Sequence, residues 1–367
     1  MFQSLLTINN ICWYGGSFHP APEADCTPAA LHGRFACVSS RGGGVTLSRD
    51  RLGLNKLFLA VHESGTVLAA NYLIDLVNRG VPFESIYSVP AGHRLDLDPA
   101  GEISCLTRYP ELEDETDPHD TGLYDVARDI REHLERWFGR LAAQFGARKI
   151  CVCLSGGGDS GVIAALALQY FSDVTAYTYS FFDPGVSLSD DAVYAERLAS
   201  ALRIPFRLVP ASSEDLLVSL DNALCYGQDW RDFNVHCAIV NDIVARAIRE
   251  DNGTDESSEA PLVFTGDLAN ELLADYAPEQ FDGREYYRLP EVNPVALRRA
   301  LIRGLDAGDR EVGIFAHYGL DVIQPYERFL ATEREKLERG LTELRGAQQE
   351  TTTLERRVTD TFPVTSG

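Results

Sequence analysis

The segment Lys149-Ile-Cys-Val-Cys-Leu-Ser-Gly-Gly-Gly-Asp-Ser160 decides the fold of this chain. Its apolar first half, 149–154, has the length and composition of a buried strand. The glycine-rich half, 155–160, follows without a break, and a helical pattern occupies 161–170. The three glycines therefore connect a buried strand to a helix.

A loop of this composition predicts a site for a polyphosphate. Glycine allows backbone angles that a side chain forbids, so several N–H groups can face one anion beside the positive end of the helix. Ser155 and Ser160 add hydroxyl donors. Asp159 would repel a phosphate unless a cation lay between them, which predicts Mg²⁺. The loop lacks the Gly-Lys-Ser/Thr of a Walker A motif, and a tight turn without a ligand is the alternative.

Around this segment, strand-like and helix-like stretches alternate. We expect strands at 174–180, 205–209 and 262–265, and helices at 190–202 and over a long region, 213–250. An amphipathic helix is predicted before the first strand from the apolar residues Leu123, Val126, Ile130, Leu134, Trp137 and Leu141. This alternation predicts a parallel sheet covered by helices on both faces.

The first 110 residues have a different pattern, with short β-prone runs at 56–61 and 66–70 between turn-rich pieces. An acidic stretch without hydrophobic periodicity follows. We therefore expect four parts: a β-rich domain, a linker, an α/β domain and a tail, at 1–110, 111–121, 122–345 and 346–367.

Composition limits the partners and the location. A formal net charge of −22 argues against nucleic acid and anionic membranes as partners. We expect no signal peptide and no membrane span. The eight cysteines are scattered, which is typical of small core residues in a reducing compartment, so we expect a cytoplasmic protein.

Several motifs together resemble one family. The loop at 155–160 resembles that of the N-type ATP pyrophosphatases, and further stretches resemble the asparagine synthetase and β-lactam synthetase family within that group. Those stretches are 47–58, 86–96, 190–199, 264–276 and 309–326.

The resemblance implies an α/β protein. Its first part would be a β-rich remnant of an Ntn-hydrolase-like glutaminase domain. Its second part would be a doubly wound parallel-sheet ATP pyrophosphatase domain of the adenine nucleotide α-hydrolase-like type. A homodimer is compatible with the sequence.

The implied activity is that of an ATP-dependent, AMP-forming amide synthetase. The enzyme would adenylate a carboxylate of a small molecule, release pyrophosphate and couple the acyl group to an amine, within one molecule or between two. ATP and Mg²⁺ are the implied cofactors. ATP and pyrophosphate would contact Leu154, Ser155, Gly156, Gly157, Gly158, Asp159, Ser160, Ser180 and Gly266.

Two departures from the family change the expected chemistry. Working glutaminase domains begin with a nucleophilic cysteine, whereas this chain begins Met1-Phe2, so we expect no glutaminase activity and a scaffold role for the first part. Asp267 falls where the family has a glutamate, and we expect it to orient the amine. Asn270 replaces a metal-binding aspartate, which makes Asp159 and Asn270 the expected metal ligands.

A third departure concerns the family's catalytic lysine. The only lysines are Lys56 in the scaffold, Lys149 before the first strand, and Lys336. Lys336 is a candidate, although a surface partner for the surrounding glutamates is the alternative. Arginines are the other candidates for the catalytic cation, Arg310 first, with Arg328 and Arg334 as further ones.

The acceptor pocket of the family borders the stretch 228–237. Its polar residues Asp229, Arg231, Asp232, Asn234 and His236 are candidate substrate contacts, although the start of a capped helix explains them equally well. Two other functions remain open. A sulfur-transferring enzyme would need a reactive cysteine pair, and we expect Cys151 and Cys153 to face opposite sides of one strand. A catalytically impaired or partner-dependent nucleotide-binding protein is the second.

Overall fold

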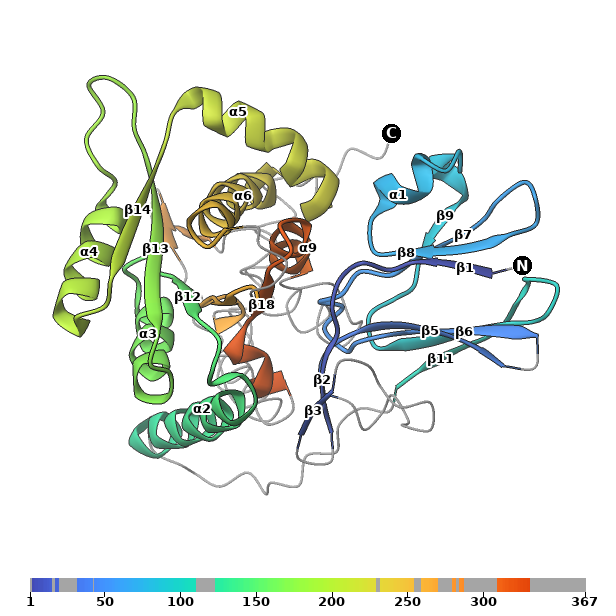
Figure 1. Ribbon diagram of the computed structural model, residues 1–367, viewed down its shortest axis with the longest axis horizontal. Helices are drawn as coiled ribbons and strands as arrows, with labels where there is room; N and C mark the ends of the chain where they lie inside the picture. Colours follow the sequence, from blue (N-terminus) through green and yellow to red (C-terminus); the bar gives the residue numbers. More distant parts are fainter. Residues whose placement is uncertain are drawn as a thin grey trace.

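The computed structural model describes residues 2–14, 17–19, 32–41, 43–109, 123–228, 232–253, 259–269, 279–281, 284–286 and 309–330. Two parts lie side by side in Figure 1, a β-rich part formed by the first 109 residues and an α/β part formed by the rest. The predicted linker and tail lie outside the described residues, so the predicted domain boundaries stay predictions.

The α/β part is built on a parallel sheet of five strands. In spatial order they are β14 (Phe206–Ala211), β13 (Val174–Phe181), β12 (Ile150–Cys153), β15 (Leu262–Phe264) and β18 (Asp321–Ile323). The chain proceeds outward from β12 in one direction and then returns to add β15 on the other side. Such a reversal opens a crevice outside the carboxyl ends of β12 and β15, where sheets of this kind bind ligands.

Helices cover both faces of this sheet (Figure 1). One face carries α2 (Leu123–Phe145), α3 (Gly158–Tyr170) and α4 (Asp190–Leu202), and the other carries α5 (Ser213–Asn222), α6 (Asp232–Asp251) and α9 (Asp309–His317). The doubly wound α/β fold predicted for this part is therefore confirmed. Among the described residues no helix is long and apolar enough to cross a membrane.

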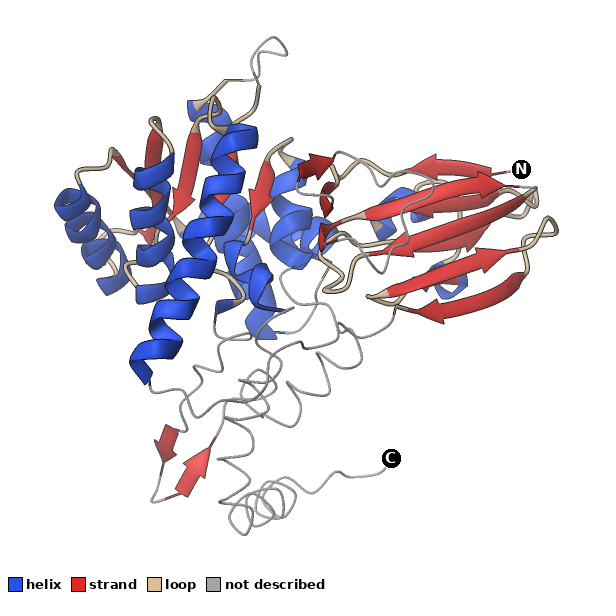
Figure 2. Cartoon of the chain, turned by 90° about the horizontal axis from the view of Figure 1, so that it is seen from below, coloured by secondary structure: helices blue, strands red, loops and turns tan. Residues whose placement is uncertain are grey.

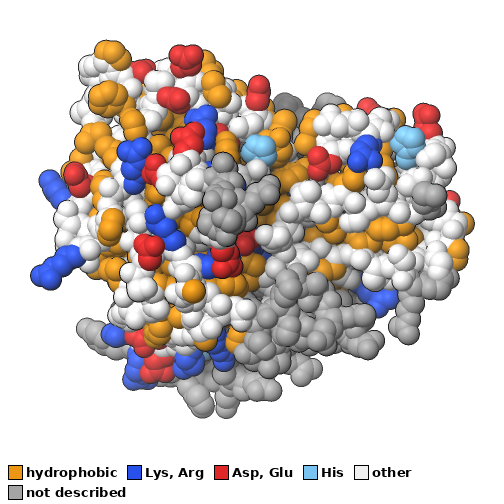
Figure 3. Space-filling model, viewed as in Figure 1, with side chains coloured by type: hydrophobic (Ala, Val, Ile, Leu, Met, Phe, Trp, Pro, Cys, Tyr) orange, Lys and Arg blue, Asp and Glu red, His pale blue; other side chains and the backbone are white. Residues whose placement is uncertain are grey.

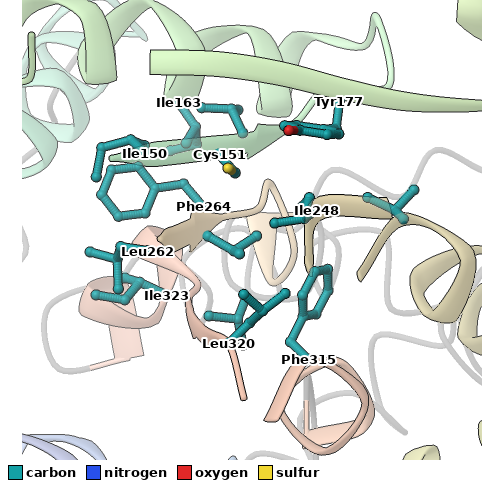
Figure 4. Packing of buried hydrophobic residues seen from close by; sticks show 14 of the residues in the cluster. Ile150, Cys151, Ile163, Tyr177, Ile248, Leu262, Phe264, Phe315, Leu320 and Ile323 are labelled. Atoms are coloured by element: carbon teal, nitrogen blue, oxygen red, sulfur yellow. The ribbon is translucent and has the colours of Figure 1, made fainter. Parts of the chain in front are cut away.

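The core of the α/β part lies on both sides of the sheet. Figure 4 shows strand residues Cys151 and Phe264 among Ile163 of α3, Ile248 of α6 and Phe315 of α9. The amphipathic face predicted for α2 also belongs to this core, where Leu134, Trp137, Phe138 and Leu141 are buried. Burial of such side chains is the main stabilising contribution to a fold of this size.

The long helical region predicted at 213–250 is two helices rather than one. A capping box of Ser212 and Asp215 starts α5, which continues into one π-helical turn, η3 (Ala223–Gly227). Gln228 then takes a left-handed conformation with φ of 53°, which ends the helix before α6 begins. Apolar periodicity does not record this break. A left-handed turn at Gln228 could not be expected from the sequence either, because glutamine rarely adopts positive φ.

The β-rich part contains two four-stranded sheets that enclose a core of Leu47, Leu57, Leu59, Ala69 and Leu95. One sheet consists of β1 (Phe2–Leu5), β8 (Val67–Ala70), β7 (Phe58–Val61) and β9 (Ile86–Ser88). The other consists of β11 (Ile103–Arg108), β10 (His93–Leu97), β6 (Gly44–Arg49) and β5 (Ala36–Arg41).

Smaller elements complete the fold. A three-stranded sheet contains β3 (Ser17–His19), β2 (Ile11–Tyr14) and β4 (His32–Arg34), and β16 (Glu279–Phe281) pairs with β17 (Arg284–Tyr286). The short helices are α1 (Leu73–Val77), η2 (Phe83–Ser85) and η4 (Pro325–Leu330). Figure 2 shows the helices of the α/β part on one side and the sandwich of strands on the other.

The two parts share a continuous interface. Trp13 of β2 packs edge-on against Trp137 of α2, with ring centroids 5.7 Å apart. The Tyr72 hydroxyl donates to the carbonyl of Gly313 at 2.8 Å. Both tryptophans and Tyr72 belong to the core cluster of the α/β part, so the first part is packed into the second.

Candidate active site

The loop between β12 and α3 is held by hydrogen bonds between its own residues. Its two serines are linked, with Ser155 Oγ 3.0 Å from Ser160 Oγ, and the Ser160 hydroxyl also accepts from the Ser155 amide at 3.1 Å. Gly157 is the N-cap of α3 and supplies no side chain to cap it. The first amides of a helix that starts in this way are suited to bind an anion.

Gly156 and Gly266 are required by close packing around this loop. Gly156 has φ of +79°, and a Cβ there would lie 2.7 Å from the Ala195 amide nitrogen in α4. A Cβ at Gly266, after β15, would lie 2.8 Å from the Ser160 amide nitrogen. The loops after β12 and β15 thus touch at the reversal of strand order, and the predicted contact of both glycines with ATP stays a prediction.

A tyrosine from the far end of the sheet also reaches the loop. Tyr326 follows β18, is buried, and donates its hydroxyl to the carbonyl of Asp159 at 3.1 Å. Burial first, and then the negative charge of Asp159, raise the pKa of Tyr326. The Pro-Tyr turn at 325–326 therefore buttresses the start of α3.

Ser180 lies at the end of β13, on the same edge of the sheet. Its side chain is fully buried, where its hydroxyl accepts from the Ser189 amide at 3.3 Å and donates to the Phe181 carbonyl at 3.3 Å. These bonds shape the turn into α4. Its predicted contact with ATP stays a prediction.

The structure brings Asp267 and Arg310 together near the carboxyl end of β15. Burial alone would lower the pKa of Arg310, but Glu311, then Cys237 and Asp267, raise it well above its usual value. The Arg310 Nε donates to Glu311 Oε1 at 2.6 Å, and Glu311 is buried. The Arg310 guanidinium is therefore held by Glu311 and lies close enough to Asp267 to feel its charge.

Several predicted site residues lie outside the described part of the chain. They are Lys336, Asn270, Asp229 and Arg231. The backbones of Asp232 and Asn234 form the start of α6, although their side chains are not described, and His236 is exposed on that helix. Within the described residues no three His, Cys, Asp or Glu side chains are grouped to hold a metal ion.

The expectation that Cys151 and Cys153 face opposite sides of β12 is wrong. Residues two apart on a strand point to the same face. Burial, then Asp267 and then Cys151 raise the pKa of Cys153, while burial raises that of Cys151 to about 12. Both sulfurs are thus kept as thiols, which opposes sulfur chemistry for a different reason from the one expected.

Lys56, which sequence reasoning left in the scaffold, is the main residue that was missed. Its ammonium donates to the carbonyl of Gly227 at 2.9 Å and lies 3.3 Å from Asp309 Oδ2, next to Arg310. Only the scarcity of lysine in this chain hinted at a special role.

A comparison with known protein families identifies the family of this chain. The family model described as asparagine synthase matches residues 103–356, which is more than half of the chain. The fold and the family match define an asparagine synthetase-like synthetase domain. The chain belongs to the asparagine synthase family, whose members are ATP-dependent enzymes that form amide bonds.

Solved structures give weaker likenesses. The NH3-dependent NAD synthetase of Campylobacter jejuni is 20% identical, with 41% of this chain and 60% of that one covered and a TM-score of 0.27. The NMN synthetase of Francisella tularensis is 19% identical, with coverages of 48% and 71% and a TM-score of 0.28. The U34-tRNA thiolase NcsA of Methanococcus maripaludis is 14% identical, with coverages of 66% and 76% and a TM-score of 0.32. No curated protein matches the chain.

Proposed function

We propose that this protein is an AMP-forming amide synthetase that adenylates a carboxylate of a small molecule and transfers the acyl group to an amine. The observation that carries the proposal is the contact of three loops at the reversal of strand order. The loop 155–160 is touched by Gly266 from one side and by Tyr326 from another.

The loop would hold the pyrophosphate half of ATP. The amides at the start of α3 and the hydroxyls of Ser155 and Ser160 are donors for its oxygens. The carboxylate of Asp159 beside them suits an oxygen-preferring cation, and Asn270 is the second proposed ligand. Bound Mg²⁺ would supply positive charge to the leaving pyrophosphate.

The reaction then has two steps. A carboxylate oxygen of the substrate attacks the α-phosphorus, the bond to the β-phosphate breaks, and pyrophosphate leaves. An amine nitrogen next attacks the acyl carbon, AMP leaves, and the nitrogen gives up a proton. We assign orientation of the amine to Asp267 and neutralisation of the developing negative charge to Arg310, with Lys336 as the alternative cation.

The amine is proposed to come from outside the first part of the chain. A glutaminase in this family uses an N-terminal cysteine, whereas Cys12 is internal and its side chain is fully buried. Ammonia, a partner's product or an amine of the substrate itself would serve instead. The cytoplasmic location and the oligomeric state stay predictions.

A pyrophosphate-release assay tests the proposal. With ATP, Mg²⁺ and a panel of carboxylates, the enzyme should form AMP and pyrophosphate in equal amounts, and chelation of Mg²⁺ should abolish both. Asp159→Asn should lower the rate by about 100-fold, because a single preorganised charge contributes about that much. ATP that binds but is never cleaved would support the nucleotide-binding alternative. Glutamate formed from glutamine would overturn the scaffold role.

A further inference from the structure

The side chain of Lys56 crosses from the β-rich part into the α/β part. It is buried, and its Nζ donates to the carbonyls of Gly227 at 2.9 Å and Gln228 at 3.1 Å. Asp309 Oδ2 lies 3.3 Å away. Arg49 lies 3.6 Å from the same oxygen, so two buried cations of the β-rich part share the Asp309 carboxylate.

The segment that presents Lys56 is held rigidly. The Arg49 guanidinium is buried and donates to the carbonyls of Gly53 at 2.7 Å and Asn55 at 3.0 Å. The neighbouring Asp50 carboxylate accepts from the amides of Leu54 and Asn55, each at 2.9 Å. The turn before Lys56 therefore has little freedom to move.

Both segments that Lys56 contacts adjoin Arg310. Asp309 directly precedes it at the start of α9. Gly227 packs on its aliphatic stem, because a Cβ at Gly227 would lie 3.4 Å from Arg310 Cγ. Gln228 is held as well, since its side-chain oxygen accepts from the Leu73 amide at 2.7 Å. The β-rich part thus holds in place the segment 227–228, against which the Arg310 side chain packs.

We propose that Lys56 is a positioning residue through which the β-rich part sets the location of Arg310 in the synthetase site. This inference rests on the proposed function for its effect on catalysis. It gives the β-rich part a role in catalysis, through the position of Arg310, that does not depend on glutaminase chemistry. A misplacement of about 1 Å in a catalytic group can lower a rate by about 100-fold.

The test compares Lys56→Met with Arg34→Met. Both changes remove a buried cation that joins the two parts, because Arg34 lies 3.3 Å from Asp321 Oδ1. Asp321 begins β18 and so lies at the end of the sheet opposite the crevice. Arg34 also donates to Asn55 Oδ1 at 3.3 Å, so Arg34→Met likewise removes one contact to the turn before Lys56.

Activity and hydrogen exchange are measured on both variants. Lys56→Met should lower kcat for pyrophosphate release by about 10- to 100-fold and change KM for ATP by less than about twofold, since the phosphate loop is not touched. It should also speed amide exchange in 223–228 and 309–314. Arg34→Met should do neither, and Lys56→Arg should restore part of kcat.

The exchange readout keeps the inference testable without activity. If the wild-type protein cleaves no ATP, the proposed function fails, and faster exchange confined to Lys56→Met still supports the positioning role. Unchanged exchange or unchanged kcat in that variant overturns it. If Lys56→Met does not fold, adding Asp309→Asn removes the carboxylate that has lost one of its two buried cations, and the same two measurements decide.

Discussion

Gly156 meets two independent demands at the residue scale. Its φ of +79° lies in the region that only glycine enters readily, and α4 leaves no room for a side chain there. Gly185, in the turn before α4, has φ of +88°, but a Cβ at that position would meet nothing within 4 Å. The pair therefore separates the conformational cost from the packing cost.

Substituting Gly156 with alanine should therefore destabilise the protein more than Gly185→Ala. The control should cost about 1 kcal/mol, from the left-handed conformation alone. Gly156→Ala should cost about 3 kcal/mol, because overpacking adds about 1–3 kcal/mol, and it should also abolish ATP binding. Urea unfolding and ATP titration measure the two effects. Equal losses in both variants would contradict the packing argument.

Thiol reactivity offers a second residue-scale prediction. Burial raises the pKa of the Cys151 thiol to about 12, so almost no thiolate forms at pH 8. Cys105 is exposed and should react with iodoacetamide within minutes. We expect peptide mapping to find Cys151 unlabelled until the protein is unfolded. Similar labelling of the two cysteines in the native protein would show that the strand is not buried as described.

The element that connects most of the site is α9. Its first turn carries Arg310 and the buried Glu311, and its end carries His317. The His317 ring stacks on Tyr226 of η3, with ring centroids 3.5 Å apart and planes 14° from parallel. The helix is thus held at both ends against the segment that leads into α6.

His317 should make stability depend on pH. Burial lowers its pKa below 6.5, although the nearby Asp242 acts in the opposite direction. The unfolded chain then binds a proton at a higher pH than the native state, so stability should fall as the pH drops below about 6.5. His317→Phe keeps a ring for stacking and should flatten this dependence. Urea unfolding between pH 5 and 8 measures the free energy of unfolding of both proteins. The same pH dependence in both would contradict the prediction.

At the scale of the whole molecule, charged side chains hold the two parts together. Asp321 accepts from Arg34 of the β-rich part at 3.3 Å and from Arg148 of the α/β part at 3.2 Å. Burial alone would raise the pKa of Asp321, but Arg34, then Asn9 and Arg148, lower it below 3.8. On the face drawn in Figure 3, by contrast, Lys and Arg are interspersed with Asp and Glu over the described surface.

Asp321→Asn should destabilise the folded protein by about 3 kcal/mol at pH 7, because it leaves the buried Arg34 without its carboxylate and Arg148 with only the exposed Glu259. Asp96→Asn is the matched control at an exposed pair with Arg94, and should cost less than about 1 kcal/mol. Since the native pKa of Asp321 is lowered, its contribution is lost as the pH falls below 3.8. The difference in stability between wild type and Asp321→Asn should therefore disappear in acid. Thermal unfolding of both proteins measures it. A stability difference that persisted at acidic pH would exclude the ion pair as its cause.

The sequence by itself determined most of the elements and the glycine loop that joins β12 to α3. The helix predicted at 190–202 is α4, Asp190–Leu202, because Ser189 caps its start and Arg203 turns left-handed at its end. The strand predicted at 174–180 is one residue longer. Caps, apolar runs and glycine turns are local signals, so a single stretch of chain is enough to show them.

Only the tertiary structure decided which distant residues meet. Gly266 touches Ser160, and Arg310 lies near Asp267, because the parallel strands pair in an order that no local pattern records. The same applies to Lys56, whose three oxygen partners lie more than 170 positions away in the sequence. Local periodicity reports which face of an element is buried, whereas packing between elements determines what that face contacts.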